Sequence, residues 1–479
     1  MTISARLGAA IAAGVPVLVL VSMGPVAVLA GPPSVLVWLV SALVGLLMAL
    51  MFAELAGAHP KVNGGVAVLA ATVLRPRSQV LARVSQWSYW LGWSPALAIN
   101  GLLVGSYAQR LLLPGAPAWS AVLLATAVLT GSVAVNHLGM RVGGRMQVVL
   151  VGCVAATVAA LFAGALVRGE FEVGNFVPFA PPAGWSSVDG WLAVAGCLFM
   201  AGWSAYGAEL ALAYATQYRS GVRDAVRVTA VVGVASVVAF AVVPFLLLAT
   251  VGVGGVRQDP ADAFHDLAAR STAGASTVVL AVLTLALLLG MNMIAIASSW
   301  TLHQMAGGGD AWSRLGRLNR HGMPGNALRF DLAVNVGLLV AITALSRGNT
   351  AAVPIALLAA ANVGYFVSMS AAVYAAWLNH RNTAVRGVLR LRPGLWRLAP
   401  AIMCFNLVLL ATAGYAWGWR NVAIGAAVLA TAIAIATWRR GRAAPPEPVA
   451  VLPACWGKAG AGVSGEPFPL EAPLRDGGT

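Results

Sequence analysis

A single carboxylate stands in the middle of an apolar stretch of this sequence. Glu209 follows two glycines, Gly202 and Gly207, in the run CLFMAGWSAYGAELALAYATQ. An acidic side chain in an apolar helix costs several kcal/mol, so such a residue is functional by default. Glycine weakens a helix, and backbone N–H and C=O groups freed by a break can bind charge. The stretch therefore predicts binding of a charged or dipolar small molecule beside Glu209.

Two roles for Glu209 stay open. Its carboxyl group can be protonated or hydrogen-bonded to freed backbone, and so hold a broken helix against its neighbours. Alternatively, it can gain and lose a proton during a working cycle.

A second apolar run is interrupted in the same way. The run PVLVLVSMGPVAVLAG contains Ser22, Met23, Gly24 and Pro25 near its middle. Lipid cannot satisfy exposed backbone groups, so breaks in membrane helices survive only where they face protein or a water-filled cavity.

Composition shows what kind of element carries these residues. The chain has 479 residues, of which 59% are hydrophobic and 9% charged, against roughly 25% charged in a soluble protein. The apolar residues come in blocks of about 20, the length that crosses a bilayer core. We predict an all-α polytopic membrane protein with twelve spans, at residues 7–30, 34–56, 85–112, 118–136, 147–167, 190–216, 228–252, 275–304, 330–346, 353–378, 398–418 and 421–438.

The basic residues predict the orientation of these spans. With the N-terminus inside, six of the 30 Lys and Arg residues fall on the outer side and the other 24 on the cytoplasmic side. The outer six are Arg110, Arg168, Arg257, Arg270, Arg347 and Arg420. Cytoplasmic loops of membrane proteins carry such an excess. The bias predicts cytoplasmic N- and C-termini and explains the net charge of +15 without a nucleic-acid partner.

The two ends of the chain need separate interpretations. Residues 439–479 are rich in Pro and Gly without apolar periodicity, which predicts a disordered cytoplasmic tail. The alternative for the first span is a signal peptide. The apolar run from Leu7 to Ala30 is longer than a usual signal core, and its removal would leave eleven spans.

The two interrupted spans are the first and the sixth. If spans one to five and six to ten are inverted repeats, the breaks occupy equivalent places, and such pairs point to the central site of a transporter. We therefore predict one domain over residues 1–438, with repeats at about 7–167 and 190–378 and two extra helices at about 398–438. The alternative is that these glycines only allow close helix packing.

Several motifs in order resemble the amino acid–polyamine–organocation (APC) superfamily over roughly residues 8–438. They are ELAGAHPKVNGG (54–65), WSYWLGW (87–93), NHLGMRVGGRMQ (136–147), GNFVPFAP (174–181), AYGAELALAYATQYRSGVRDAVR (205–227) and SSWTLHQMAGGGDAWSRLGRLNRHGMPGNAL (298–328). The resemblance implies a LeuT-type fold of five plus five helices with two more, alternating access, and amino acids or amines as substrates. It favours a structural and gating role for Glu209.

A substrate site follows from the breaks. An amino acid is a zwitterion, so its carboxylate needs N–H donors and its ammonium needs carbonyl acceptors. We expect the backbone of Ser22, Met23 and Gly24 to bind the carboxylate, and that of Ala201, Gly202 and Trp203 to bind the ammonium. By resemblance, the Trp203 ring covers the substrate, with Tyr206 as a second wall. Spans that line such sites in the superfamily also carry Asn100, Asn292, Asn362 and Tyr365.

The coupling ion is less defined. A sodium site of the LeuT type would combine the first break with hydroxyls of the eighth span, where Ser298 and Ser299 lie. The fifth span has no lysine, which some proton-coupled relatives use there. A proton is favoured over sodium as the coupling ion, and an exchanger or a weakly coupled facilitator is an equal alternative to a proton symporter.

Other functional classes are less well supported. The sequence has no HExxH, GxSxG or CxxC motif, so we expect no enzyme, no metal site and no cofactor. A sensor that binds without transporting is the remaining alternative. A polyamine pocket should show two or more carboxylates, and Glu209 is the only candidate, which favours an amino acid over a polyamine. We therefore predict an amino acid permease of the cell membrane, or, as the alternative, an amine or organocation exchanger or exporter.

Overall fold

The fold consists of helices running through a bundle. A computed structural model describes residues 2–117, 119–258, 260, 263–272, 276–346, 353–382 and 387–440, and a single short bridge, Ile3 to Tyr218, is the only β-type pairing among them. Eleven helices of the described residues are long and apolar enough to cross a membrane. The predicted all-α polytopic fold is thereby confirmed. The predicted tail, from residue 441 onward, lies outside the described residues.

The helices have the following bounds, with 3₁₀ helices written η. The first half comprises α1 (Ala5–Ala12), η1 (Pro16–Leu18), α2 (Val19–Ala30), α3 (Ser34–Ala58), α4 (Gly65–Leu74), α5 (Gln79–Trp93), α6 (Ala96–Leu112), α7 (Trp119–His137), α8 (Met140–Val167) and η2 (Val173–Phe176). The second half comprises α9 (Val188–Ala205), η3 (Gly207–Gln217), α10 (Val222–Thr250), α11 (Gly252–Gln258), α12 (Ala263–Ser271), α13 (Ser276–Gly307), η4 (Ser313–Gly316), α14 (Gly325–Ser346), α15 (Val353–Arg381), α16 (Pro393–Trp396), α17 (Ala399–Trp417) and α18 (Trp419–Arg440).

Eleven of the twelve predicted spans match the eleven long apolar helices. The remaining one, 85–112, is divided between α5 and α6 at Ser94 and Pro95. Proline cannot donate a backbone hydrogen bond and disrupts the helix before it. The Ala98 N–H at the start of α6 donates to the Asn335 side chain on α14 instead. This interruption is therefore held by a neighbouring helix.

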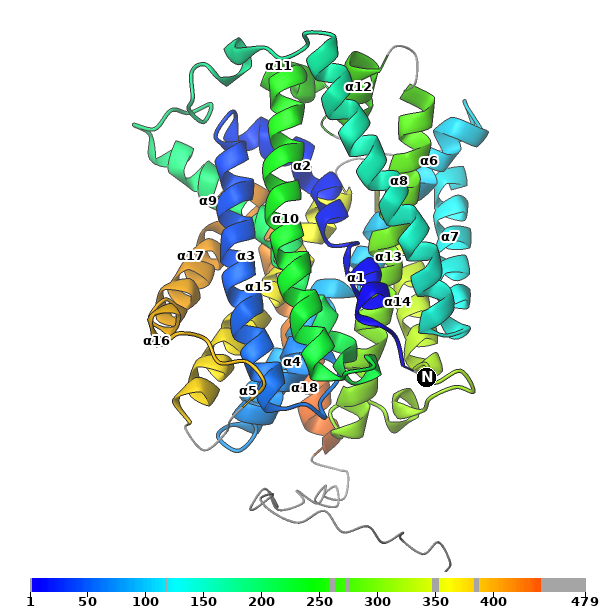
Figure 1. Ribbon diagram of the computed structural model, residues 1–479, viewed down its shortest axis with the longest axis vertical. Helices are drawn as coiled ribbons and strands as arrows, with labels where there is room; N and C mark the ends of the chain where they lie inside the picture. The colour runs from blue at the N-terminus through cyan, green and yellow to red at the C-terminus, as the bar shows by residue number, and fades with distance from the viewer. Residues whose placement is uncertain are drawn as a thin grey trace, which may run out of the picture. The chain divides into compact units, whose positions relative to one another are not determined.

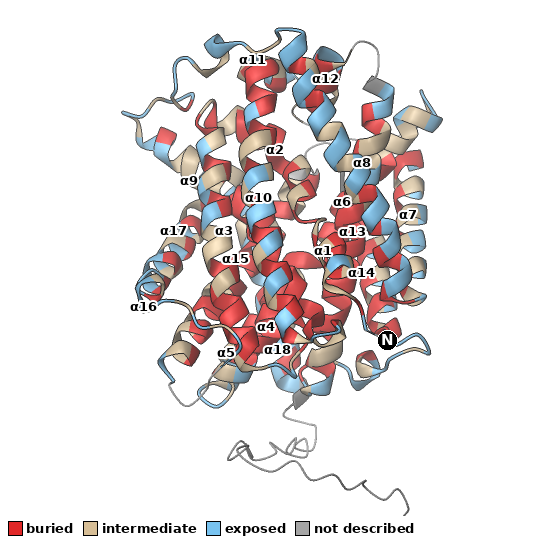
Figure 2. Cartoon of the chain, viewed as in Figure 1, coloured by how far each residue is buried: buried red, intermediate tan, exposed pale blue. Residues whose placement is uncertain are grey.

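The bundle has a buried interior and an apolar outer surface. In Figure 1, α1 and α2 lie one above the other near the middle, α3 and α10 run side by side, and α7 and α8 lie toward one edge. Figure 2 shows the buried residues concentrated on the inner helices, with α8 largely exposed. Exposed side chains on α8 include Val149 and Val167, at 66% and 85%. An exposed valine face suits contact with lipid.

Both ends of the described chain lie at the same end of the bundle. Figure 1 places the start of the chain near the lower end, where the last turn of α18 also lies, whereas α11 and α12 lie at the opposite end. An even number of crossings puts the two ends on one side of a membrane, as the twelve-span prediction requires.

The first span is broken earlier than the sequence predicted. The α-helix stops at Ala12 and resumes at Val19, with a 3₁₀ turn at Pro16–Leu18 between them. The predicted break at Ser22–Gly24 is wrong, because α2 is continuous α-helix there and includes Pro25. A Cβ on Gly24 would lie 1.8 Å from the Pro260 carbonyl oxygen, so this glycine serves close packing.

The sixth span breaks at Gly207, the second of the two glycines that predicted an interruption, and not at Gly202. Ala201, Gly202 and Trp203 lie inside α9, and the backbone changes at Tyr206. The next eleven residues, Gly207–Gln217, form a 3₁₀ helix with Tyr214 outside helical φ/ψ values. Runs of 3₁₀ helix this long are uncommon and often mark a hinge. The backbone of Ala201, Gly202 and Trp203, predicted to bind an ammonium group, is therefore inside continuous helix, and the break lies at Tyr206 and Gly207.

The far end of η3 is fixed by the loop between α3 and α4. Asn63 accepts from the Thr216 N–H at 2.8 Å and Gly64 donates to the Ala213 carbonyl at 2.7 Å. The Gly64 carbonyl in turn accepts from Thr301 on α13. Gly64 has φ +90°, a conformation that glycine adopts at little cost.

Candidate functional site

The two broken helices meet at their interruptions. The Ser204 hydroxyl, in the last turn of α9, donates to the Leu18 carbonyl oxygen at 3.1 Å. At Gly207 a Cβ would lie 3.1 Å from the side chain of Val15, which stands in the break of the first span. The predicted pairing of breaks in spans one and six therefore exists in space, although the break in the first span lies earlier in the chain than predicted.

The interruption between α5 and α6 lies next to the breaks of the first and sixth spans. Trp93, the last residue of α5, packs against Trp203 with 5.0 Å between ring centroids and against Tyr365 with 5.1 Å. It also lies 3.3 Å from the position of a Cβ on Gly207. Three interrupted spans and α15 thus converge on one aromatic cluster, which we define as Trp93, Trp203, Tyr206, Tyr365 and Phe366.

Each polar group of the predicted aromatic walls already has a protein partner. Trp203 is fully buried and its Nε1–H donates to the Gly92 carbonyl at 2.9 Å. The Tyr206 hydroxyl donates to the Asn406 side chain on α17 at 3.2 Å. Both rings can therefore present only an apolar face to a ligand in this conformation.

Glu209 is clamped between two tyrosines. Tyr89 on α5 donates to one carboxylate oxygen at 2.7 Å, and Tyr365 on α15 donates to the other at 3.2 Å. The residue is fully buried. With a donor on each oxygen, Glu209 ties η3 to α5 and α15, and this supports its holding role.

Asn100 on α6 is the polar side chain best placed for a ligand. It is fully buried, and within the described chain neither its Oδ1 nor its Nδ2 has a hydrogen-bond partner. A Cβ on Gly290 of α13 would lie 3.2 Å from Leu18 and 3.8 Å from Asn100 Nδ2. The Asn100 side chain and Leu18 of the first break therefore both lie next to Gly290.

Other predicted site residues lie elsewhere. Asn292 accepts from Asn136 at 2.7 Å and adjoins Gly143, so it joins α13 to α7 and α8. Asn362 donates to the Phe199 carbonyl and joins α15 to α9. Ser22 is buried in α2, and Met23 and Gly24 line a small pocket with Pro260.

The two serines proposed for sodium are not brought to the first break. Ser299 donates to the Ile296 carbonyl of its own helix at 2.9 Å. The first break touches α13 at Leu289 and Gly290, and Ser298 lies eight residues further, about 12 Å along a helix. Carbonyls of this break and these hydroxyls do not form one site in this conformation.

Asp331 is a buried acid that no sequence motif singled out. It is fully buried in the second turn of α14, and its Oδ1 accepts from Trp90 Nε1 and Ser94 Oγ, each at 2.9 Å. It is the second residue of the predicted span 330–346, where no role was predicted for it. The sequence spacing could have drawn attention to Asp331, because Asp331 and Asn335 are four residues apart and two polar side chains at this spacing share one face of a helix.

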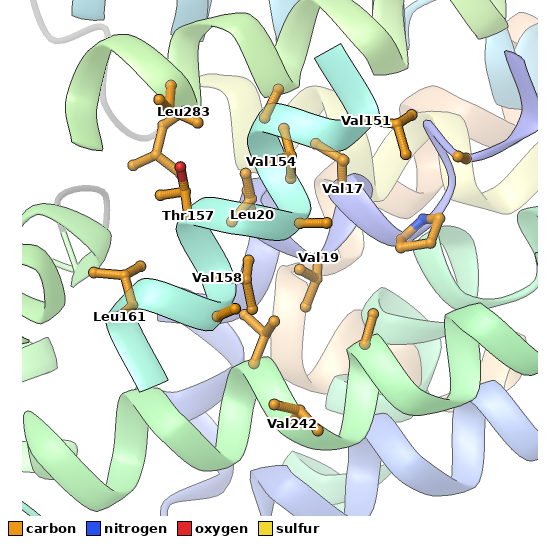
Figure 3. Close-up of a pocket in the computed structure, with 18 of the residues that line it drawn as sticks. Val17, Val19, Leu20, Val151, Val154, Thr157, Val158, Leu161, Val242 and Leu283 are labelled. Carbon is orange, nitrogen blue, oxygen red and sulfur yellow. The ribbon is translucent and has the colours of Figure 1, made fainter. Parts of the chain in front are cut away.

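A separate cavity of about 770 Å³ adjoins the first break on its other side. Residues of α8, α10 and α13 line it together with Ala13, Pro16, Val17 and Leu20. Figure 3 shows Val151, Val154 and Val158 of α8 facing Val17, Val19 and Leu20 across it. Its walls are almost wholly apolar. They include side chains on the outer surface such as Val238, at 57% exposed, so this cavity opens toward the lipid side and does not suit a zwitterion.

The family model for amino acid permeases matches residues 4–436. The chain belongs to the amino acid permease family. This permease is accordingly a member of the APC superfamily, as its motifs indicated. It is a multi-pass membrane transporter of amino acids or related organic cations. No curated relative matches the permease significantly.

Proposed function

We propose that this permease moves zwitterionic amino acids across the cell membrane by alternating access, with both termini in the cytoplasm and with two repeats at about 7–167 and 190–378. One structural arrangement carries the proposal: the two breaks meet beside a buried amide that has no partner among the described residues. The breaks of the first and sixth spans are joined by Ser204 and Leu18, and the amide of Asn100 next to them has no partner in the described part of the chain.

The chemistry of the site supports an amino acid. The first break offers backbone between Ala12 and Val19, and the Asn100 amide offers both a donor and an acceptor. A zwitterion needs both kinds of group. A polyamine would need free carboxylates at the breaks, whereas Glu209, the acid next to the break of the sixth span, has both oxygens occupied by Tyr89 and Tyr365.

The aromatic cluster supplies the rest of the wall. Trp203 and Trp93 belong to different interrupted spans and pack together. A movement of either span therefore changes the space between them, which is what a gate beside a central site requires.

Counterflow in proteoliposomes tests the proposal. Vesicles are loaded with one unlabelled amino acid or amine at a time, and the entry of a trace of the same labelled compound is followed. We expect accumulation for a class of amino acids and none for polyamines. Accumulation of polyamines alone would overturn the substrate class, and no accumulation by folded protein across the panel would overturn transport.

A further inference from the structure

The two carboxylate oxygens of Asp331 differ in their hydrogen bonding within the described residues. Its Oδ1 accepts two hydrogen bonds, from Trp90 and Ser94. Its Oδ2 has no hydrogen-bond partner among the residues described. The Ser298 hydroxyl lies close to the carboxylate, but the two groups do not meet in hydrogen-bonding geometry, and Ser298 has no other partner in that set. A proton on Oδ2 would turn this oxygen into a donor, and the Ser298 hydroxyl is an acceptor.

Glu209 provides the contrast within the same chain. Both of its oxygens have tyrosine donors, so its hydrogen bonding is complete without a further proton. Asp331 is equally buried, but its hydrogen bonding is incomplete. Leaving a buried charged oxygen unsatisfied is costly, and a bound proton removes that cost.

No described cationic side chain compensates for Asp331. The groups that face it are Trp90 and Ser94 from α5 and its end, and Ser298 from α13. The other titratable groups on the elements packed around Asp331 have other partners or positions. Arg83 pairs with Asp310, Tyr89 donates to Glu209, His303 packs on Trp300 and His137 bonds to the Val133 carbonyl. Arg329 is exposed, and Tyr107 and Arg110 lie toward the far end of α6.

The acid is connected to the candidate site through the end of α5. Asn335, one turn after Asp331, donates to the Ser94 hydroxyl at 3.1 Å and accepts from the Ala98 N–H. Ser94 follows Trp93, which packs against Trp203. A displacement of Trp93 therefore moves Ser94, and with it one of the two donors that Asp331 has.

We propose that Asp331 is a proton-binding site that couples proton movement to the transport cycle; this rests on the proposed function. A proton enters Oδ2 from water on one side of the membrane and leaves to water on the other. Its binding changes with the position of Ser94. The ligand of the site is thus the proton. Asp331 does not touch the substrate and acts on it through Ser94 at the end of α5 and, by way of Asn335, through Ala98 at the start of α6.

The test compares the wild type with Asp331→Asn in vesicles that contain a pH-sensitive dye. Asparagine keeps an acceptor for Trp90 and Ser94 and places an N–H₂ donor toward Ser298, as the protonated acid would. We expect substrate counterflow within a few fold of the wild type, loss of substrate-induced proton movement, and loss of accumulation driven by a pH gradient. Asp224→Asn is the matched control, because Asp224 is buried and accepts from the Ser220 N–H away from this cluster; its proton movement should equal that of the wild type.

Two outcomes of the transport test reject the proposal while leaving the transport function in place. One is wild-type proton movement in Asp331→Asn. The other is wild-type counterflow with no proton movement at all. Absence of wild-type counterflow would instead reject the proposed function.

An infrared measurement decides the protonation of Asp331 independently of transport. The purified protein is compared in acidic and alkaline buffer, and the C=O band of a protonated carboxylic acid is recorded. We expect a band that Asp331→Asn lacks and that Ser298→Ala shifts, because this variant removes the acceptor. If the wild type and Asp331→Asn give the same bands, or Asp331→Asn does not fold and Ser298→Ala leaves every band in place, Asp331 is not a proton site.

Discussion

Tyr89 on α5 and Glu209 on η3 are joined by a hydrogen bond of 2.7 Å between two fully buried side chains. The bond connects the interrupted third span to the second half of the sixth. A Cβ on Gly65, the first residue of α4, would lie 3.1 Å from the Tyr89 hydroxyl oxygen, so the start of α4 and the carboxylate meet at one tyrosine.

Replacing Glu209 tests whether this clamp is needed for transport. Glu209→Gln keeps a group between the two tyrosine hydroxyls, so we expect a folded protein. Glu209→Ala leaves both hydroxyls buried without a partner, at about 1–3 kcal/mol each, and should abolish transport. Thermal unfolding and counterflow measure the two effects. Wild-type transport rates in the alanine variant would show that the clamp is dispensable.

Asn100 should contribute to binding and not to stability. Its amide has no partner in the described chain, so Asn100→Leu should unfold at the same temperature or higher, while substrate affinity falls about tenfold or more, as for loss of a buried hydrogen bond to a charged group. Asn136→Leu should give the opposite pattern, because Asn136 bonds to Asn292 in the protein. Unchanged affinity in Asn100→Leu would place the substrate elsewhere.

Asp310 should be a stability residue. It is buried and pairs with both Arg75 and Arg83, with 3.4 Å between Arg83 Nε and Asp310 Oδ1. Removing one partner of a buried ion pair costs about 3–5 kcal/mol, so Asp310→Asn should lower the free energy of unfolding by that order. Glu170→Gln is the control, because the Arg168–Glu170 pair is 43% and 30% exposed and such pairs contribute about 1 kcal/mol or less. Equal losses in both variants would contradict the assignment.

His59 predicts a pH dependence of stability. Burial lowers the pKa of His59 from 6.5, with a smaller opposing effect from the hydrogen bond to Asn379. As pH falls through 6.5, the unfolded chain takes up a proton before the folded protein does, so stability decreases. His59→Gln cannot take up this proton and should lose less stability than the wild type between neutral and mildly acidic buffer. Parallel unfolding curves for the two proteins would exclude His59 as a cause.

The spans were predictable because their information is local. A block of about 20 apolar residues is readable without knowing its neighbours, and eleven such helices are present in the described chain. The α5/α6 interruption was missed because Pro95 alone does not tell whether a helix bends or stops. The side chains that stabilise the stop, Asp331 and Asn335, are more than 230 residues away in sequence.

The breaks were predicted in the right spans. In the sixth span the predicted Gly207 lies at the break, whereas in the first span the break comes before Ser22–Gly24. Gly24 and Pro25 look like a break but lie in continuous helix, since Gly24 provides room for the Pro260 carbonyl. Pro16, at the start of the 3₁₀ turn, marks the true position. Whether a glycine serves a break or a close contact depends on what packs against it, and the sequence does not contain that neighbour.

Both halves of the sixth span are hydrogen-bonded to α5 and α15: α9 through the Trp203 indole and the Phe199 carbonyl, and η3 through the Glu209 carboxylate. The α9 half is fixed by Trp203 to Gly92 and by Tyr206 to Asn406, and the η3 half by Asn63 and Glu209. Within the described residues, the side-chain hydrogen bonds of one half do not involve the other. The soft dihedrals at this joint are φ and ψ of Tyr206 and Gly207. A change in the angle between the two halves therefore requires α5 and α15 to move with the span, or one set of these hydrogen bonds to break.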